Sequence, residues 1–92
     1  MPRQEQPAVL SDDVADTHLA IESLREELNA IDLYNQRVED SSDHELKALL
    51  AHNRDEEKEH AAMLLEWLRR KDPTFAKELR DWLFTDKPFA HS

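Results

Sequence analysis

The chain has 92 residues, which is too short to bury a large apolar core in one copy, so we expect it to associate. Its 21 acidic and 12 basic residues give a net charge of -9, which argues against nucleic acids and anionic membrane surfaces as partners and favours cations. Cysteine is absent, so disulfides and thiolate metal sites are excluded, and a bound metal would need oxygen and imidazole ligands.

The absence of glycine and of long apolar runs limits which folds and cellular locations the sequence favours. The sequence contains no glycine, which argues against phosphate-cradling loops and favours a nearly all-helical chain. No apolar run approaches the roughly 20 residues that a membrane span needs, and the N-terminus lacks the apolar segment of a signal peptide. We therefore expect a soluble protein of the cytoplasm.

The first part of the chain predicts an arm and a long helix. Residues 1–12 carry two prolines without periodicity, which indicates a flexible arm ending in the cap-forming letters SDD. A helix is expected over about 13–39, because apolar or semi-polar side chains recur there at alternating spacings of three and four: Val14, Thr17, Ile21, Leu24, Leu28, Ile31, Asn35 and Val38.

Two further helices complete the expected domain. Ser42 and Glu45 have the spacing of a capping box, which predicts a second helix over 43–71. Asp72 and Pro73 predict the start of a third helix over 73–84. We thus expect an all-α antiparallel two-helix hairpin with a short C-terminal helix, forming one domain over 13–88, and a loose C-terminus over 89–92.

The second helix has a polar interruption in its apolar stripe. Leu50 and Leu64 continue the stripe on either side of Glu57 and His60, which lie one turn apart on the same face. A Glu-x-x-His spacing lets a carboxylate oxygen and an imidazole nitrogen reach one ion. The spacing alone equally fits a solvated charged run, but a charged pair on a packed face needs partners or a metal.

The first helix offers a third ligand. With the turn centred near Ser41, antiparallel pairing places Glu27 within about one helical turn of Glu57. One Glu and one Glu-x-x-His form half of the carboxylate-rich di-iron site of ferritin-like bundles, so two copies related by a two-fold axis would complete it. Such a set suits iron, without excluding manganese or zinc. We expect divalent metal to promote the dimer or a larger assembly.

The stretch from "EELNAIDLYNQRVED" through "AHNRDEEKEHAAMLLEWLRR" and the later "LFTDKP" resembles the encapsulated ferritin family. The resemblance covers roughly residues 15–88. It implies a ferroxidase that oxidises two Fe(II) with dioxygen between paired subunits, and a larger ring, typically a decamer, as cargo inside an encapsulin shell in the cytoplasm. It implies that Glu27, Glu57 and His60 are the iron ligands, that Tyr34 stands near the metals, and that Glu26 belongs to an outer metal-uptake site.

The chain also departs from the family pattern. Asn29 stands where the family often has an acidic residue, and Leu33 where it often has tryptophan. Many members carry a longer tail with a docking peptide, whereas this chain stops at "PFAHS".

A second function stays open at this point. The chain would instead be a non-catalytic helical assembly or adaptor protein if Glu57 and His60 formed a structural polar network or held zinc without turnover. The other histidines and Arg54 with Asp55 are interpreted as ordinary surface groups.

Overall fold

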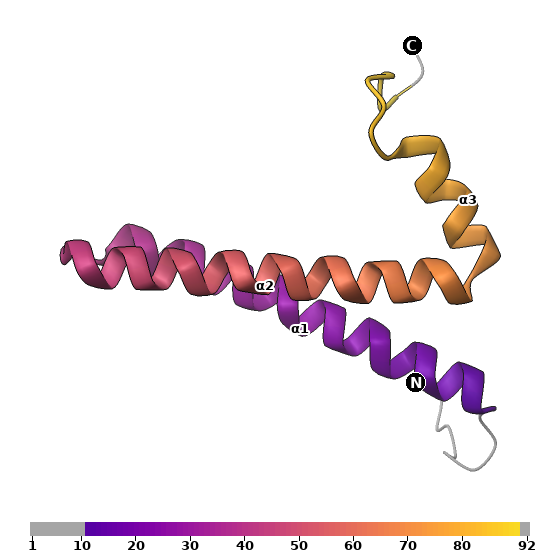
Figure 1. The fold of residues 1–92 in the computed structure, drawn as a ribbon, viewed down its shortest axis with the longest axis horizontal. Coiled ribbons are helices and arrows are strands. Elements are labelled where there is room, and N and C mark those ends of the chain that lie inside the picture. The colour runs from indigo at the N-terminus through magenta and orange to yellow at the C-terminus, as the bar shows by residue number, and fades with distance from the viewer. Residues whose placement is uncertain (1–10, 91–92) are drawn as a thin grey trace, which may run out of the picture.

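The structure is a computed structural model that describes residues 11–90, and it is built from three helices (Figure 1). These are α1 (Asp12–Asp40), α2 (His44–Lys71) and α3 (Pro73–Trp82), and residues 11–90 contain no strand. The predicted all-α class is confirmed. Residues 1–10 of the expected arm and residues 91–92 of the expected loose C-terminus lie outside the described residues.

Side-chain caps define where the two long helices begin. The Ser11 hydroxyl accepts a hydrogen bond from the Val14 backbone N–H at 3.1 Å and starts α1. At α2, the cap is Asp43, whose carboxylate accepts from the Leu46 N–H at 2.8 Å. The predicted capping box at Ser42 is therefore wrong. Ser41 instead supports the turn, because its hydroxyl accepts from the Asp43 N–H, and this leaves Asp43 in position to cap.

The third helix starts as predicted but ends earlier. The Asp72 carboxylate accepts from the Phe75 N–H at 3.0 Å, and Pro73 occupies the first turn. The helix ends at Trp82 rather than at residue 84, because Leu83 has extended backbone angles and Phe84 has a φ of 60°. The Thr85 hydroxyl donates to the Trp82 carbonyl and satisfies one of the free acceptors at this end.

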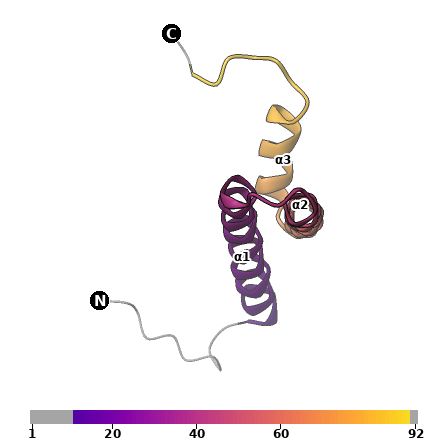
Figure 2. The same cartoon turned by 90° about the vertical axis from the view of Figure 1, so that its left-hand side faces the viewer.

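The helices α1 and α2 form an antiparallel hairpin joined by a three-residue connection, Ser41–Asp43. The two helices cross, and they diverge toward the start of α1 and the end of α2 (Figure 1). Helix α3 turns sharply away from the end of α2 and projects from the hairpin (Figures 1 and 2). The hairpin is therefore the element in which residues of α1 and α2 can form a shared site.

Little of the apolar surface is buried within one chain. Among the described residues, three apolar side chains are buried, and two of them are alanines: Ala20, Ala61 and Leu68. Large apolar side chains remain at least one-third exposed on all three helices and beyond, including Val14, Ile21 and Leu28 on α1, Leu49 and Met63 on α2, and Phe84 and Phe89 after α3. Much of the predicted stripe on α1 is thus left available to a partner. In residues 11–90, no helix is long and apolar enough to span a membrane.

Candidate metal centre

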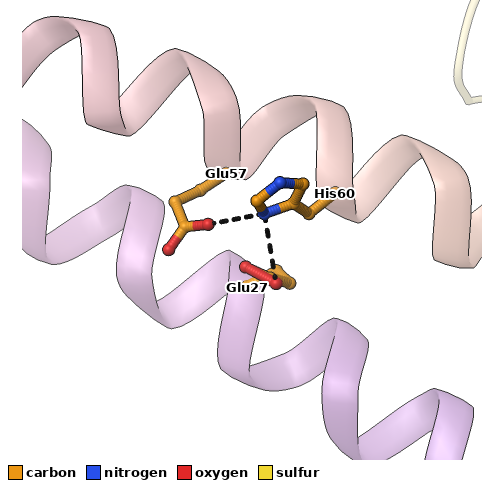
Figure 3. Close-up of side chains that lie close together, drawn as sticks. All are labelled: Glu27, Glu57 and His60. Carbon is orange, nitrogen blue, oxygen red and sulfur yellow. Dashed lines mark hydrogen bonds and ion pairs between the residues drawn. The ribbon is translucent and has the colours of Figure 1, made fainter.

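Three side chains with metal-ligating atoms converge where α1 and α2 pack together (Figure 3). Glu27 comes from the middle of α1, and Glu57 and His60 come from successive turns of α2. One ligand atom from each of the three residues lies within 4.8 Å of the other two. The structure therefore brings together the same three residues that the sequence analysis selected, although their role as ligands stays a prediction.

The three groups are arranged around one ring nitrogen. His60 Nδ1 lies 2.8 Å from Glu57 Oε1 in a hydrogen bond, and 3.7 Å from Glu27 Oε2 (Figure 3). Both carboxylates thus face the same nitrogen from two different helices. A cation in this position would take the place of the proton that the imidazole shares with the carboxylates.

The exposure of the three side chains differs. Glu27 and Glu57 are half-buried, with 22% and 24% of their side-chain surface exposed, whereas His60 is 51% exposed. The carboxylates are therefore held between the helices, while the imidazole lies at the edge of the hairpin. This edge leaves room for ligands from outside the chain.

The electrostatics of the cluster favour added positive charge. Burial, the hydrogen bond to Glu57 and the repulsion of its carboxylate raise the pKa of Glu27, and His60 only partly opposes this. The hydrogen bond to Glu57 likewise raises the pKa of His60, so the imidazole holds its proton more strongly than usual. Both shifts favour the protonated form of the group, and Glu57 contributes to each of them.

Two further predicted site residues lie outside this cluster. Glu26 is exposed on α1 and lines a shallow surface hollow with Glu22, Arg25, Leu28 and Asn29. Tyr34 is half-buried two turns beyond Glu27, and the Arg37 guanidinium lies 5.3 Å from its ring centroid. In the described part of the chain, no hydrogen bond links either residue to the three clustered side chains. Their predicted roles therefore remain untested.

The structure also shows contacts that sequence reasoning missed. Arg54 was interpreted as a surface ion-pair residue, and it does pair with Asp55 at 3.1 Å. However, its Nη1 also donates a hydrogen bond to Asn35 Oδ1 on α1 at 3.1 Å. Arg54 lies one turn before Glu57 on α2. The appearance of Asn35 in the apolar stripe of the first helix was a signal for this contact. His52, interpreted as an ordinary surface group, is exposed and lies 3.5 Å from Glu56.

The donor set fits a hard divalent or trivalent cation. Two carboxylates and one imidazole supply oxygen and nitrogen ligands, the combination that iron, manganese and zinc accept. One chain supplies only three ligand residues, and the half-exposed imidazole leaves one side of the set open. The three residues therefore fit a metal centre that needs further ligands from outside this set.

Comparison with known proteins places the chain in a family. Residues 2–86 match the EncFtn-like family. The chain is 60% identical over 80 residues to the encapsulated ferritin-like protein of Rhodospirillum rubrum, covering 87% of this chain and 57% of that protein. It is 37% identical over 71 residues to the encapsulin nanocompartment cargo protein EncC of Myxococcus xanthus, covering 74% of this chain and 55% of that protein.

A solved structure shares the fold over nearly the full length of both chains. The crystal structure of protein NE0167 from Nitrosomonas europaea has a TM-score of 0.90 and 67% sequence identity, and the match covers 99% of this chain and 100% of that one. The two curated relatives above are longer, so the chain spans slightly more than half of their length. The match to residues 2–86 and these identities show that the chain belongs to the EncFtn-like family of encapsulated-ferritin-like proteins.

Proposed function

We propose that the protein is a ferroxidase, which oxidises Fe(II) to Fe(III) with dioxygen at a di-iron centre formed between two copies of the chain. The observation that carries this proposal is the convergence of Glu27, Glu57 and His60 from two helices on one position. Membership of a ferritin-like family supports iron as the ion.

The need for a second copy follows from the number of ligands. Iron in carboxylate-rich sites takes more ligands than two carboxylates and one imidazole supply, and a two-fold axis beside His60 would bring a second, identical set. Two sets hold four carboxylates, whose charge of about -4 would be neutralised by two Fe(II) ions. The exposed apolar side chains of α2, such as Met63, support association on this side of the hairpin.

The residues would contribute to oxidation through charge and position. Carboxylates held between the helices stabilise Fe(III) more than Fe(II), because the attraction grows with the charge of the ion. Two Fe(II) substrates held side by side supply two electrons to one dioxygen molecule. When iron displaces the shared proton, the His60 imidazole is left neutral and its Nδ1 lone pair is free to bind.

The flanking residues have proposed roles that follow from their positions. Glu26 is exposed and lies next to Glu27, so it would form part of an outer uptake site, weakened here because Asn29 is uncharged. Tyr34 would stand near the bound metals only after pairing, since no hydrogen bond joins it to the cluster within the described part of one chain. Both proposals rest on the family resemblance and on placement along α1.

The proposed cellular setting is an encapsulin nanocompartment in the cytoplasm. A relative that is 37% identical is named as an encapsulin nanocompartment cargo protein, and another is named as an encapsulated ferritin-like protein. A hairpin of this size encloses no mineral cavity, so the Fe(III) product would be stored in the shell that holds the protein. We propose that the pairs assemble further into a ring, with a decamer as the expected size.

The test is aerobic Fe(II) oxidation, followed by absorbance, for the wild type, Glu57→Ala and His60→Ala, with the oligomer mass recorded for each. Fast oxidation at about one iron per chain, lost in both variants, is the expected result. Glu45→Ala is the matched control, because Glu45 lies in the first turn of α2, far along the helix from the cluster.

The alternative function has its own signature in the same experiment. Equal, slow oxidation in all the proteins would contradict the ferroxidase proposal. It would favour a non-catalytic assembly or adaptor protein with a structural Glu–His network, and tight zinc binding without turnover would favour a zinc-stabilised assembly.

A further inference from the structure

Along the hairpin, buried apolar side chains lie on one side of the candidate metal centre, and a polar contact between α1 and α2 lies on the other. The three buried side chains all lie toward the open end of the hairpin: Ala20 precedes Glu27 on α1, and Ala61 and Leu68 follow His60 on α2. Toward the Ser41–Asp43 connection, apolar side chains such as Ile31, Val38 and Leu50 are partly buried. A polar contact between the helices adds to apolar packing on this side of the candidate site.

Arg54 provides the link on the other side. Its side chain is only 23% exposed, and its guanidinium donates both to Asp55 on its own helix and to Asn35 on α1. Within residues 11–90, the other polar side-chain contacts between α1 and α2 are those that Glu27 makes with His60 and with Glu57. The Arg54–Asn35 contact is thus the polar link between the helices that does not itself involve a metal-ligating residue.

We propose that Arg54 and Asn35 are positioning residues that fix the register of α1 against α2, and so place Glu27 opposite Glu57 and His60. A slip of one residue would move Glu27 by about 1.5 Å along the axis and rotate it by about 100°. Either change would remove its carboxylate from the shared position. Arg54 lies one turn from Glu57, so the link acts close to the site.

The geometry of arginine explains why this residue type suits the position. Its planar guanidinium directs several N–H donors from one rigid group, so Nε binds Asp55 while Nη1 binds Asn35. Asp55 also pairs with Lys58 at 3.2 Å, but both side chains are more than half exposed, so this ion pair adds little to the position of Arg54. Lysine at position 54 would keep the charge but would lose this two-direction geometry.

The first experiment measures the affinity for Co(II), which does not require turnover, and its visible absorption, which reports coordination geometry. The inference rests on the proposed metal centre, so wild-type binding is measured first. Arg54→Gln, Asn35→Ala and Arg54→Lys are each expected to weaken Co(II) binding roughly 10-fold and to change the absorption spectrum. The double variant Arg54→Gln/Asn35→Ala is expected to lose no more than either single variant, because both changes break the same link.

Lys58→Gln is the matched control for charge. Lys58 is next to Glu57 and pairs only within α2 among the described residues, so its removal takes away one positive charge without breaking the contact between the helices. We expect this variant to keep its Co(II) affinity within about twofold. An equal loss in Lys58→Gln and Arg54→Gln, with full affinity in Asn35→Ala, would show that charge matters rather than register, and would overturn the inference.

A second experiment tests the register without metal. The chain has no cysteine, so Asp32→Cys and His52→Cys place two spin labels on exposed positions of α1 and α2. Labelled chains are diluted with unlabelled ones to isolate the distance within a chain. Arg54→Gln and Asn35→Ala are expected to broaden or shift this distance, and Lys58→Gln to leave it unchanged.

The two experiments separate the two proposals. If the wild type binds no Co(II), the metal centre fails, and the spin-label distance alone then decides whether Arg54 and Asn35 fix the register. If the distance is the same in the wild type and both link variants, the register proposal is refuted, whatever the metal affinity.

Discussion

Met63 offers a direct test of whether two chains pair across His60. It follows His60 by one turn on the same face of α2, and 63% of its surface is exposed in the single chain. Leu49, three turns before His60 on this face, is also exposed. If pairing occurs here, Met63→Ala should weaken the dimer while leaving the fold of each chain nearly unchanged.

The size of the effect follows from the exposed fraction. Full burial of a methionine side chain stabilises by roughly 1.5–3 kcal/mol. With 63% of its surface still exposed, association can gain roughly 1–2 kcal/mol per chain. A two-fold pair contains the residue twice, so the dimer should lose roughly 2–4 kcal/mol, and the lower figure corresponds to about 30-fold weaker pairing. Within one chain the substitution should cost less than about 0.5 kcal/mol.

The assay is sedimentation equilibrium over a series of protein concentrations, with chelator and with Fe(II) in the absence of oxygen. Metal is expected to tighten pairing in both proteins, and Met63→Ala to raise the dissociation constant in both conditions. Leu19→Ala is the control, because Leu19 is 62% exposed but lies on α1 outside its apolar stripe. A dissociation constant for Met63→Ala equal to that of the wild type would refute pairing across this face.

Three other predictions concern the hairpin and α3. Leu68→Ala removes the most buried apolar side chain of residues 11–90, which is 2% exposed, and should lower the free energy of unfolding by roughly 2–5 kcal/mol in chemical denaturation. Arg69 and Arg70 lower the pKa of Glu66 to about 2, so the stabilising effect of the Glu66 carboxylate is complete above its ordinary pKa of 4.5 and is lost as the pH falls toward 2. Glu66→Gln should therefore make the free energy of unfolding depend less on pH between these two values. An unchanged pH profile of unfolding would contradict this. Asp72→Ala removes the cap of α3 and should cost roughly 1 kcal/mol, seen as faster amide exchange confined to that helix.

The sequence predicted the helices well because their signals are local. The cap residues Ser11 and Asp72 and the proline at position 73 act through contacts within four residues, and the structure shows both caps. Ser42 failed as a cap because two neighbouring residues compete for the same role, and spacing alone does not show which one faces the free N–H. The end of α3 depends on the backbone angles of Phe84, which no nearby residue type indicates.

The cluster of Glu27, Glu57 and His60 was predictable for a related reason. A short connection fixes which residues of an antiparallel hairpin lie opposite each other, so counting from Ser41 located Glu27 to within one turn. The contact between Arg54 and Asn35 was not predictable in this way, because a long flexible side chain can reach either its own helix or the next one. The exposure of side chains such as Leu28 agrees with the expectation, drawn from the length of the chain, that one copy buries little apolar surface.

The three-residue donor set of each chain has a genetic consequence. If a complete centre needs one intact set from each of two chains, activity depends on the square of the fraction of intact chains. Co-expression of equal amounts of wild type and His60→Ala would then leave about a quarter of the pairs with two intact sets. A ligand variant of such a protein would act as a dominant inhibitor, whereas in an enzyme with a whole site per chain it would be recessive.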